Sequence, residues 1–135
     1  AGGIFGKILQ NSGIADILGQ TLTDYNMGVF LPFVLAAALK TAQGSSTVAL
    51  VTTASIIMPM MSSLGFETEI QKALVVVVIG AGSAVISHAN DSFFWVVTQM
   101  SGMNVKTGYR LFGLGTGILG LTGAITVFVF YSIFA

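Results

Sequence analysis

One polar stretch constrains the fold of this chain more than any other feature: residues 40–47, which read Lys-Thr-Ala-Gln-Gly-Ser-Ser-Thr. It lies between two uncharged apolar arms, residues 28–39 and 48–61. As helices, these arms would be roughly 18–21 Å long at about 1.5 Å per residue, whereas a bilayer core is about 30 Å thick. Neither arm crosses a membrane alone, and the polar middle does not suit hydrocarbon. The sequence therefore predicts a re-entrant hairpin over residues 28–61, in which two half-helices meet at a polar tip.

The composition supports a membrane location. Of the 135 residues, 54% are hydrophobic and only 7% are charged, whereas a soluble domain carries about 25% charged residues. The apolar runs do not alternate with polar residues, which favours helices over the strands of an outer-membrane barrel. The predicted class is an all-α integral membrane protein in contact with the lipid bilayer.

The same composition excludes several function classes. The net charge is zero and no basic patch is present, so the sequence predicts no nucleic-acid partner. There is no cysteine and a single histidine, which excludes disulfides, thiolate metal sites and histidine clusters. No nucleophile–base pair and no pair of carboxylates in a shared break is evident, so we predict neither an enzyme nor a bound metal or organic cofactor.

Three further segments complete the predicted architecture. Residues 1–20 read as a short amphipathic helix, and residues 73–100 as a discontinuous transmembrane helix with its break at residues 88–92, His-Ala-Asn-Asp-Ser. Residues 111–135 carry no charge and are predicted to form one full transmembrane helix. The chain starts without a basic segment ahead of an apolar one, so we expect no signal peptide and a start within a longer protein.

Charges in the loops predict the topology. Lys106 and Arg110 have no acidic residue nearby, so the positive-inside rule places them in the cytoplasm. If residues 28–61 return to the side from which they enter, the loop with Glu67 and the C-terminal end would then lie outside.

The two polar interruptions are the candidate functional sites. Irregular backbone is tolerated at membrane depth only where it is buried in protein or lines a cavity, and in transporters half-helix N-termini direct N–H groups at anions. In the first interruption, Gly44 permits a sharp turn. Ser45, Ser46 and Thr47 follow it, where they would cap the second arm or donate to a carboxylate. Lys40 would add a positive charge to the site, reach an interface or pair with an acid.

The second interruption contains groups that bind and groups that titrate. Asn90 and Ser92 can donate and accept hydrogen bonds. His88 and Asp91 can change protonation, as proton coupling requires. The alternative for His88 is a structural role, and for Asp91 it is to cap the helix that starts at Ser92 or to pair with Lys40.

Residues 35–49 and 87–97 resemble two signature segments of the gluconate permease family, and the opening seven residues with Ser12 and Gly13 are similar to the segment ahead of them. The resemblance implies a proton symporter of the bacterial inner membrane for gluconate or a related small sugar acid. It also implies the ion-transporter superfamily, in which two inverted repeats each supply a re-entrant hairpin and a broken helix. This chain would be the second, C-terminal repeat, and its partners would be an N-terminal repeat and, as an option, a second copy in a homodimer. The family's hairpin-tip pattern falls on Gln43, Gly44, Ser45, Ser46 and Thr47, and its broken-helix pattern on His88, Asn90, Asp91 and Ser92.

The sequence is therefore compatible with three functions. The first is proton-coupled sugar-acid transport, with the substrate at Gln43 to Thr47, Asn90 and Ser92, the proton at His88 or Asp91, and Lys40 as a charge partner. The second is a sodium-coupled carboxylate transporter of the same architecture. The third is a non-transporting membrane subunit or a passive pore lined by the two interruptions.

Overall fold

The computed structural model describes residues 4, 8, 11–12 and 27–134. These residues contain helices, turns and connecting segments and no β-strand, which confirms the prediction of an all-helical chain. Most of the amphipathic helix predicted over residues 1–20 lies outside the described residues.

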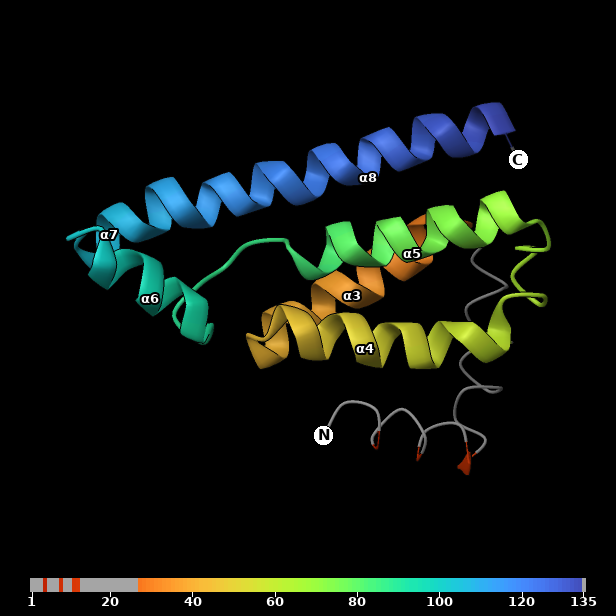
Figure 1. Ribbon diagram of the computed structural model, residues 1–135, viewed down its shortest axis with the longest axis horizontal. Helices are drawn as coiled ribbons and strands as arrows, with labels where there is room; N and C mark the ends of the chain where they lie inside the picture. The colour runs from red at the N-terminus through yellow and green to blue at the C-terminus, as the bar shows by residue number, and fades with distance from the viewer. Residues whose placement is uncertain (1–3, 5–7, 9–10, 13–26, 135) are drawn as a thin grey trace.

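Two successive helices of the described part form an antiparallel pair with a short turn between them (Figure 1). They are α3 (Phe30–Gln43) and α4 (Ser46–Ile57), and α4 continues into the 3₁₀ turn η1 (Met58–Met60). At about 1.5 Å per residue, α3 is roughly 21 Å long and α4 roughly 18 Å, so each is shorter than a bilayer core.

The polar stretch at residues 40–47 is more helical than its composition suggests. Helix α3 continues through Lys40 to Gln43 and α4 starts at Ser46, so only Gly44 and Ser45 form the turn. Gly44 has a φ of 77° and donates its N–H to the Lys40 carbonyl, which ends α3 with a left-handed residue that glycine adopts without strain. The charge of Lys40 is tolerated within α3 because it is paired with a buried carboxylate.

Helix α5 (Glu69–Ser83) packs against α3, α4 and the last helix, α8 (Leu114–Phe134). It begins with a capping box, in which the Thr68 side chain accepts from the Gln71 N–H and the Gln71 side chain accepts from the Thr68 N–H. Gly82 lies against α3, where an added Cβ would be only 2.5 Å from the Phe33 carbonyl oxygen. A small residue is needed there for the two helices to approach closely.

The chain then leaves helical geometry at residues 84–91, the segment called the break from here on. The break starts four residues earlier than the sequence predicts and ends at Asp91, where α6 (Ser92–Met100) begins. In Figure 1 it runs as an extended link that carries the chain from the end of α5 to α6, near the turn between α3 and α4.

The last helical segment is longer than expected. It comprises α7 (Val105–Gly108), the π-helical turn η2 (Tyr109–Gly113) and α8 (Leu114–Phe134). Lys106 and Arg110 were expected in a loop, but they lie in this helical segment, because Asn104 caps a helix that begins at Val105 by accepting from the Thr107 N–H at 2.9 Å. Among the described residues, Val105–Phe134 is the one helix long and apolar enough to cross a membrane.

The core of the molecule lies between α3, α4, α5 and α8. Its buried apolar side chains include Ala36, Ile57, Phe66, Val75, Val78, Ala124 and Val127. Other large apolar side chains of α8 remain exposed, among them Leu114, Ile118, Leu121, Ile125 and Phe128. An exposed apolar surface of this kind is typical of contact with lipid or with further protein.

Candidate functional site

A cavity of about 410 Å³ lies where the turn between α3 and α4 meets the end of the break. Its volume falls in the range of small-molecule sites, about 300–1,000 Å³. Its walls are formed by Gln43, Gly44, Ser45, Ser46, Thr47, Asn90, Asp91, Ser92 and Phe93. The fold thus brings together all seven residues predicted to bind substrate, and adds Asp91 and Phe93 to them. In the part of the chain that the structure describes, no group of three His, Asp or Glu side chains is positioned to hold a metal ion.

Two helices begin at this cavity. The α4 N-terminus is capped by Ser45, whose Oγ accepts from the Val48 N–H at 3.3 Å. The α6 N-terminus is capped by Asp91, whose Oδ1 accepts from the Phe93 N–H at 3.0 Å. At the start of these two helices, three backbone N–H groups have no acceptor within residues 27–134. They belong to Ser46 and Thr47 of α4 and to Ser92 of α6. Free N–H groups at two helix N-termini, each with a positive dipole end, favour an anion between them.

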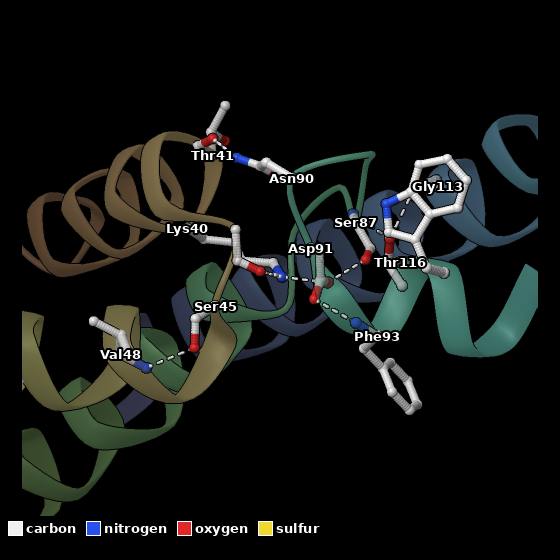
Figure 2. A network of polar contacts seen from close by, with 12 residues as sticks. Lys40, Thr41, Ser45, Val48, Ser87, Asn90, Asp91, Phe93, Gly113 and Thr116 are labelled. Atoms are coloured by element: carbon white, nitrogen blue, oxygen red, sulfur yellow. Dashed lines mark hydrogen bonds and ion pairs between the residues drawn. The ribbon is translucent and has the colours of Figure 1, made fainter. Parts of the chain in front are cut away.

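A buried ion pair joins α3 to the break (Figure 2). The Lys40 Nζ donates to the Asp91 Oδ2 at 2.6 Å and to the Gly44 carbonyl oxygen at 2.9 Å. The Lys40 side chain is only 2% exposed and does not line the cavity. The same Asp91 oxygen accepts a hydrogen bond from the Ser87 Oγ. The charge of Lys40 is therefore compensated inside the protein and lies outside the cavity wall.

A second contact holds the turn and the break at very short range. The Asn90 Nδ2 donates to the Thr41 carbonyl oxygen at 2.7 Å (Figure 2). Gly44 faces the Asn90 backbone so closely that an added Cβ would be 2.2 Å from the Asn90 carbonyl oxygen. Gly44 thus has two roles, because its backbone makes the turn and its missing side chain leaves room for the break.

The two residues predicted to carry a proton occupy different environments. Asp91 is almost completely buried, lines the cavity and has the polar partners described above. His88 lies in the break, half-buried, and is not part of the cavity wall. Its backbone carbonyl accepts from the Asp91 N–H at 2.8 Å, but among the described residues its side chain has no hydrogen-bond partner.

Two residues of the site were not predicted from the sequence. Ser87 directly precedes the predicted interruption, and Phe93 directly follows it, with 59% of its surface exposed. The one sequence feature that could have indicated these two residues is their position next to the polar interruption. A serine or an aromatic residue at a helix boundary is common and does not by itself indicate a binding site.

The comparisons with known proteins identify the family of this chain. The GntP family of permeases matches the chain over residues 1–133. This chain belongs to the GntP permease family. Curated members of similar sequence include the low-affinity gluconate transporter of Escherichia coli K12, 36% identical over 126 residues. They also include the inner membrane permease YgbN of the same strain, 38% identical over 125 residues, and a gluconate permease of Pseudomonas aeruginosa, 32% identical over 128 residues.

These alignments define how much of a GntP permease the chain represents. They cover 91–94% of this chain but only 27–28% of each relative. The chain therefore spans little more than a quarter of the length of the curated permeases it matches. No solved structure matches it. Membership of the family confirms the resemblance found in the sequence, and the relatives it is similar to are named as transporters and permeases, not as enzymes.

Proposed function

We propose that this chain is the C-terminal repeat of a permease that carries gluconate, or a related small sugar acid, across the bacterial inner membrane together with protons. The single observation that carries the proposal is the cavity onto which the N-termini of α4 and α6 open. Relatives named as gluconate transporters and permeases support the substrate class, and a relative named as an inner membrane permease supports the location.

The chemistry of the cavity fits a hydroxylated carboxylate. The free N–H groups of Ser46, Thr47 and Ser92 would hold the carboxylate, since they present two positive dipole ends to it. The side chains of Gln43 and Asn90, with the serine and threonine hydroxyls, can donate to and accept from a polyhydroxy chain. Because Lys40 is paired with Asp91, the substrate charge would be held by backbone dipoles and not by a lysine.

The architecture proposed around the cavity is that of a discontinuous-helix transporter. Helices α3 and α4 would form a re-entrant hairpin, since neither is long enough to span a bilayer, and α5 and α6 would form one broken helix. Helix α8 would cross the membrane fully, with Lys106 and Arg110 at its cytoplasmic end. An inverted N-terminal repeat would complete the cavity, and transport would move this bundle against a scaffold.

Proton coupling would act through Asp91. Its carboxylate holds the break to α3 through Lys40, so protonation would remove one charge of the pair and weaken that link. A proton delivered to Asp91 would thus change how firmly the turn and the break are joined around the substrate. His88, in the same segment, is the second candidate for the coupled proton.

Uptake into membrane vesicles tests this proposal. Vesicles that contain the permease are supplied with labelled gluconate, with and without an inward proton gradient, and with a sodium gradient instead. We expect accumulation with the proton gradient, competition by unlabelled gluconate and none by sorbitol, which has the hydroxyls but no carboxylate. Asp91→Asn is expected to bind gluconate without concentrating it, and His88→Ala is compared with it. Glu69→Gln is the matched control, because the Glu69 side chain is 89% exposed and, among the described residues, forms an ion pair with Lys72 alone.

The outcomes separate the three candidate functions. Accumulation driven by sodium and indifferent to pH would favour a sodium-coupled carboxylate transporter. Equilibration without accumulation under any gradient would favour a passive pore. If Asp91→Asn concentrates gluconate as well as Glu69→Gln does, Asp91 is a structural cap and not the coupling group.

A further inference from the structure

The backbone N–H groups of the break find different kinds of acceptor along its length. At its start, the N–H groups of Ala84 and Val85 bond to carbonyls of α5, and at its end the Asp91 N–H bonds to the His88 carbonyl. Two N–H groups in the middle, those of Ser87 and Ala89, bond to side chains of the last helical segment instead. The Thr116 Oγ1 accepts from the Ser87 N–H at 2.9 Å, and the Tyr109 hydroxyl accepts from the Ala89 N–H at 3.1 Å.

A π-helical turn in the last helical segment positions the two side chains that make these contacts. This turn, Tyr109–Gly113, lies directly before α8. Such turns alter the register between the two flanking α-helical parts and are frequent at functional sites. The Thr116 hydroxyl donates to the Gly113 carbonyl at 3.0 Å, which leaves its oxygen lone pairs for the Ser87 N–H (Figure 2). At Gly113 an added Cβ would be 3.1 Å from the Ser87 carbonyl oxygen, so a side chain there would push the break away by a few tenths of an ångström.

The backbone conformation of the break requires contacts with neighbouring residues. Ile86 has a φ of 30°, a backbone conformation that a β-branched residue rarely adopts and that persists only where the surroundings enforce it. Next to it, the Ser87 hydroxyl donates to the Asp91 carboxylate, and Asn90 and Asp91 form part of the cavity wall. Contacts that fix the backbone of Ser87 and Ala89 therefore also fix the cavity wall that Asn90 and Asp91 form.

We propose that Thr116 and Tyr109 are positioning residues for the substrate cavity. They hold the middle of the break in the conformation that presents Asn90, Asp91 and Ser92, and they connect that conformation to the π-helical turn of the last helix. Neither residue touches the cavity. The effect on substrate affinity rests on the proposed function, whereas the effect on the break itself does not.

The test compares matched variants in the permease that contains this chain. Thr116→Val is paired with Thr122→Val, because both hydroxyls donate to a backbone carbonyl one turn earlier in the last helical segment and, of the two, that of Thr116 also accepts from the break. Tyr109→Phe is paired with Tyr131→Phe, because each phenylalanine keeps a ring contact and only Tyr109 loses a hydrogen bond to the break. Hydrogen–deuterium exchange of residues 84–91 reports the order of the break, and calorimetry with gluconate reports affinity.

We expect each test variant to speed exchange in residues 84–91 about 2- to 12-fold, the range that corresponds to one net hydrogen bond. Gluconate affinity is expected to fall by a similar factor, with Thr116→Ser restoring both properties and the two control variants behaving as wild type. If exchange in Thr116→Val and Tyr109→Phe equals that of the controls, the positioning role is overturned. Faster exchange with unchanged gluconate affinity also overturns it, because the contacts would then not act on the cavity. If the test variants speed exchange in residues 84–91 but the wild-type permease binds no gluconate, Thr116 and Tyr109 do stabilise the break, and the proposed function is wrong.

Discussion

Replacing Gly44 with alanine tests the closest contact of the candidate site. Its φ of 77° and the short approach of Asn90 are two separate reasons for glycine at this position. Gly65 offers a control with only the first of them, because its φ is 79° and an added Cβ would meet nothing within 4 Å. Both Gly44→Ala and Gly65→Ala carry the cost of a left-handed alanine, about 1–2 kcal/mol. The difference between the two variants therefore isolates the contact with the break.

The size of that difference follows from the geometry. A Cβ at Gly44 would be 2.2 Å from the Asn90 carbonyl oxygen, whereas ordinary contact begins at 3.4 Å, so the turn and the break must separate by about 1.2 Å. Such a shift stretches the hydrogen bond from Asn90 to Thr41 and the charged hydrogen bond from Lys40 to Asp91 beyond hydrogen-bonding distance. A neutral hydrogen bond contributes about 0.5–1.5 kcal/mol and a charged one about 1.5–3. The contact should thus cost Gly44→Ala about 2–4 kcal/mol more than Gly65→Ala.

Gluconate binding and thermal unfolding of the purified permease measure this cost. Because about 1.4 kcal/mol corresponds to a factor of ten, we expect Gly44→Ala to bind gluconate roughly 30- to 1,000-fold more weakly than Gly65→Ala. Equal affinity and equal stability of the two variants would refute the reasoning, since the turn and the break would then not need their close approach.

Three further substitutions address the ion pair, the helix packing and a buried hydroxyl, each measured by thermal unfolding of the purified permease. Asp91→Asn is expected to lower the free energy of unfolding by about 3–5 kcal/mol because it leaves Lys40 buried and unpaired, and Lys40→Met combined with it should recover much of the loss; a double variant as unstable as Asp91→Asn would contradict this. Gly82→Ala should destabilise by about 1–3 kcal/mol through overpacking against α3, whereas Gly80→Ala, which meets open space, should be neutral or stabilising by up to about 1 kcal/mol; equal effects would argue against a tight α3–α5 contact. Thr52→Val should be neutral or stabilising, because within the described residues the buried Thr52 hydroxyl has no partner, and such an atom costs about 1–3 kcal/mol; a loss of stability would reveal a hydrogen bond to that hydroxyl.

Local sequence features account for the helical class and the approximate positions of the interruptions. Apolar runs without alternation predict helices, and the structure has no strand among its described residues. Gly44 was expected to make the turn and does so with a positive φ. These features follow from backbone conformation and from side-chain polarity over a few neighbouring residues, which a single sequence contains in full.

The exact ends of the helices were harder to predict. Lys40 reads as the start of a polar tip, yet it lies inside α3, because a partner 51 residues away compensates its charge. The break begins four residues before His88, where the sequence predicts it, because α5 ends at Ser83 within a mostly apolar stretch. The helix start at Val105 was missed because its cap, Asn104, lies in a segment with loop-like composition.

The sequence by itself thus determined that the chain is helical, suited to a membrane and interrupted twice by polar residues, because each of these properties is local. Only the tertiary structure decided which groups of the two interruptions face each other. It pairs Lys40 with Asp91, presses Gly44 against Asn90 and ties Ser87 to Thr116 of the last helix. These contacts join residues that are distant in the chain, and they form only when the packing of α3, α5 and α8 brings the helix ends together.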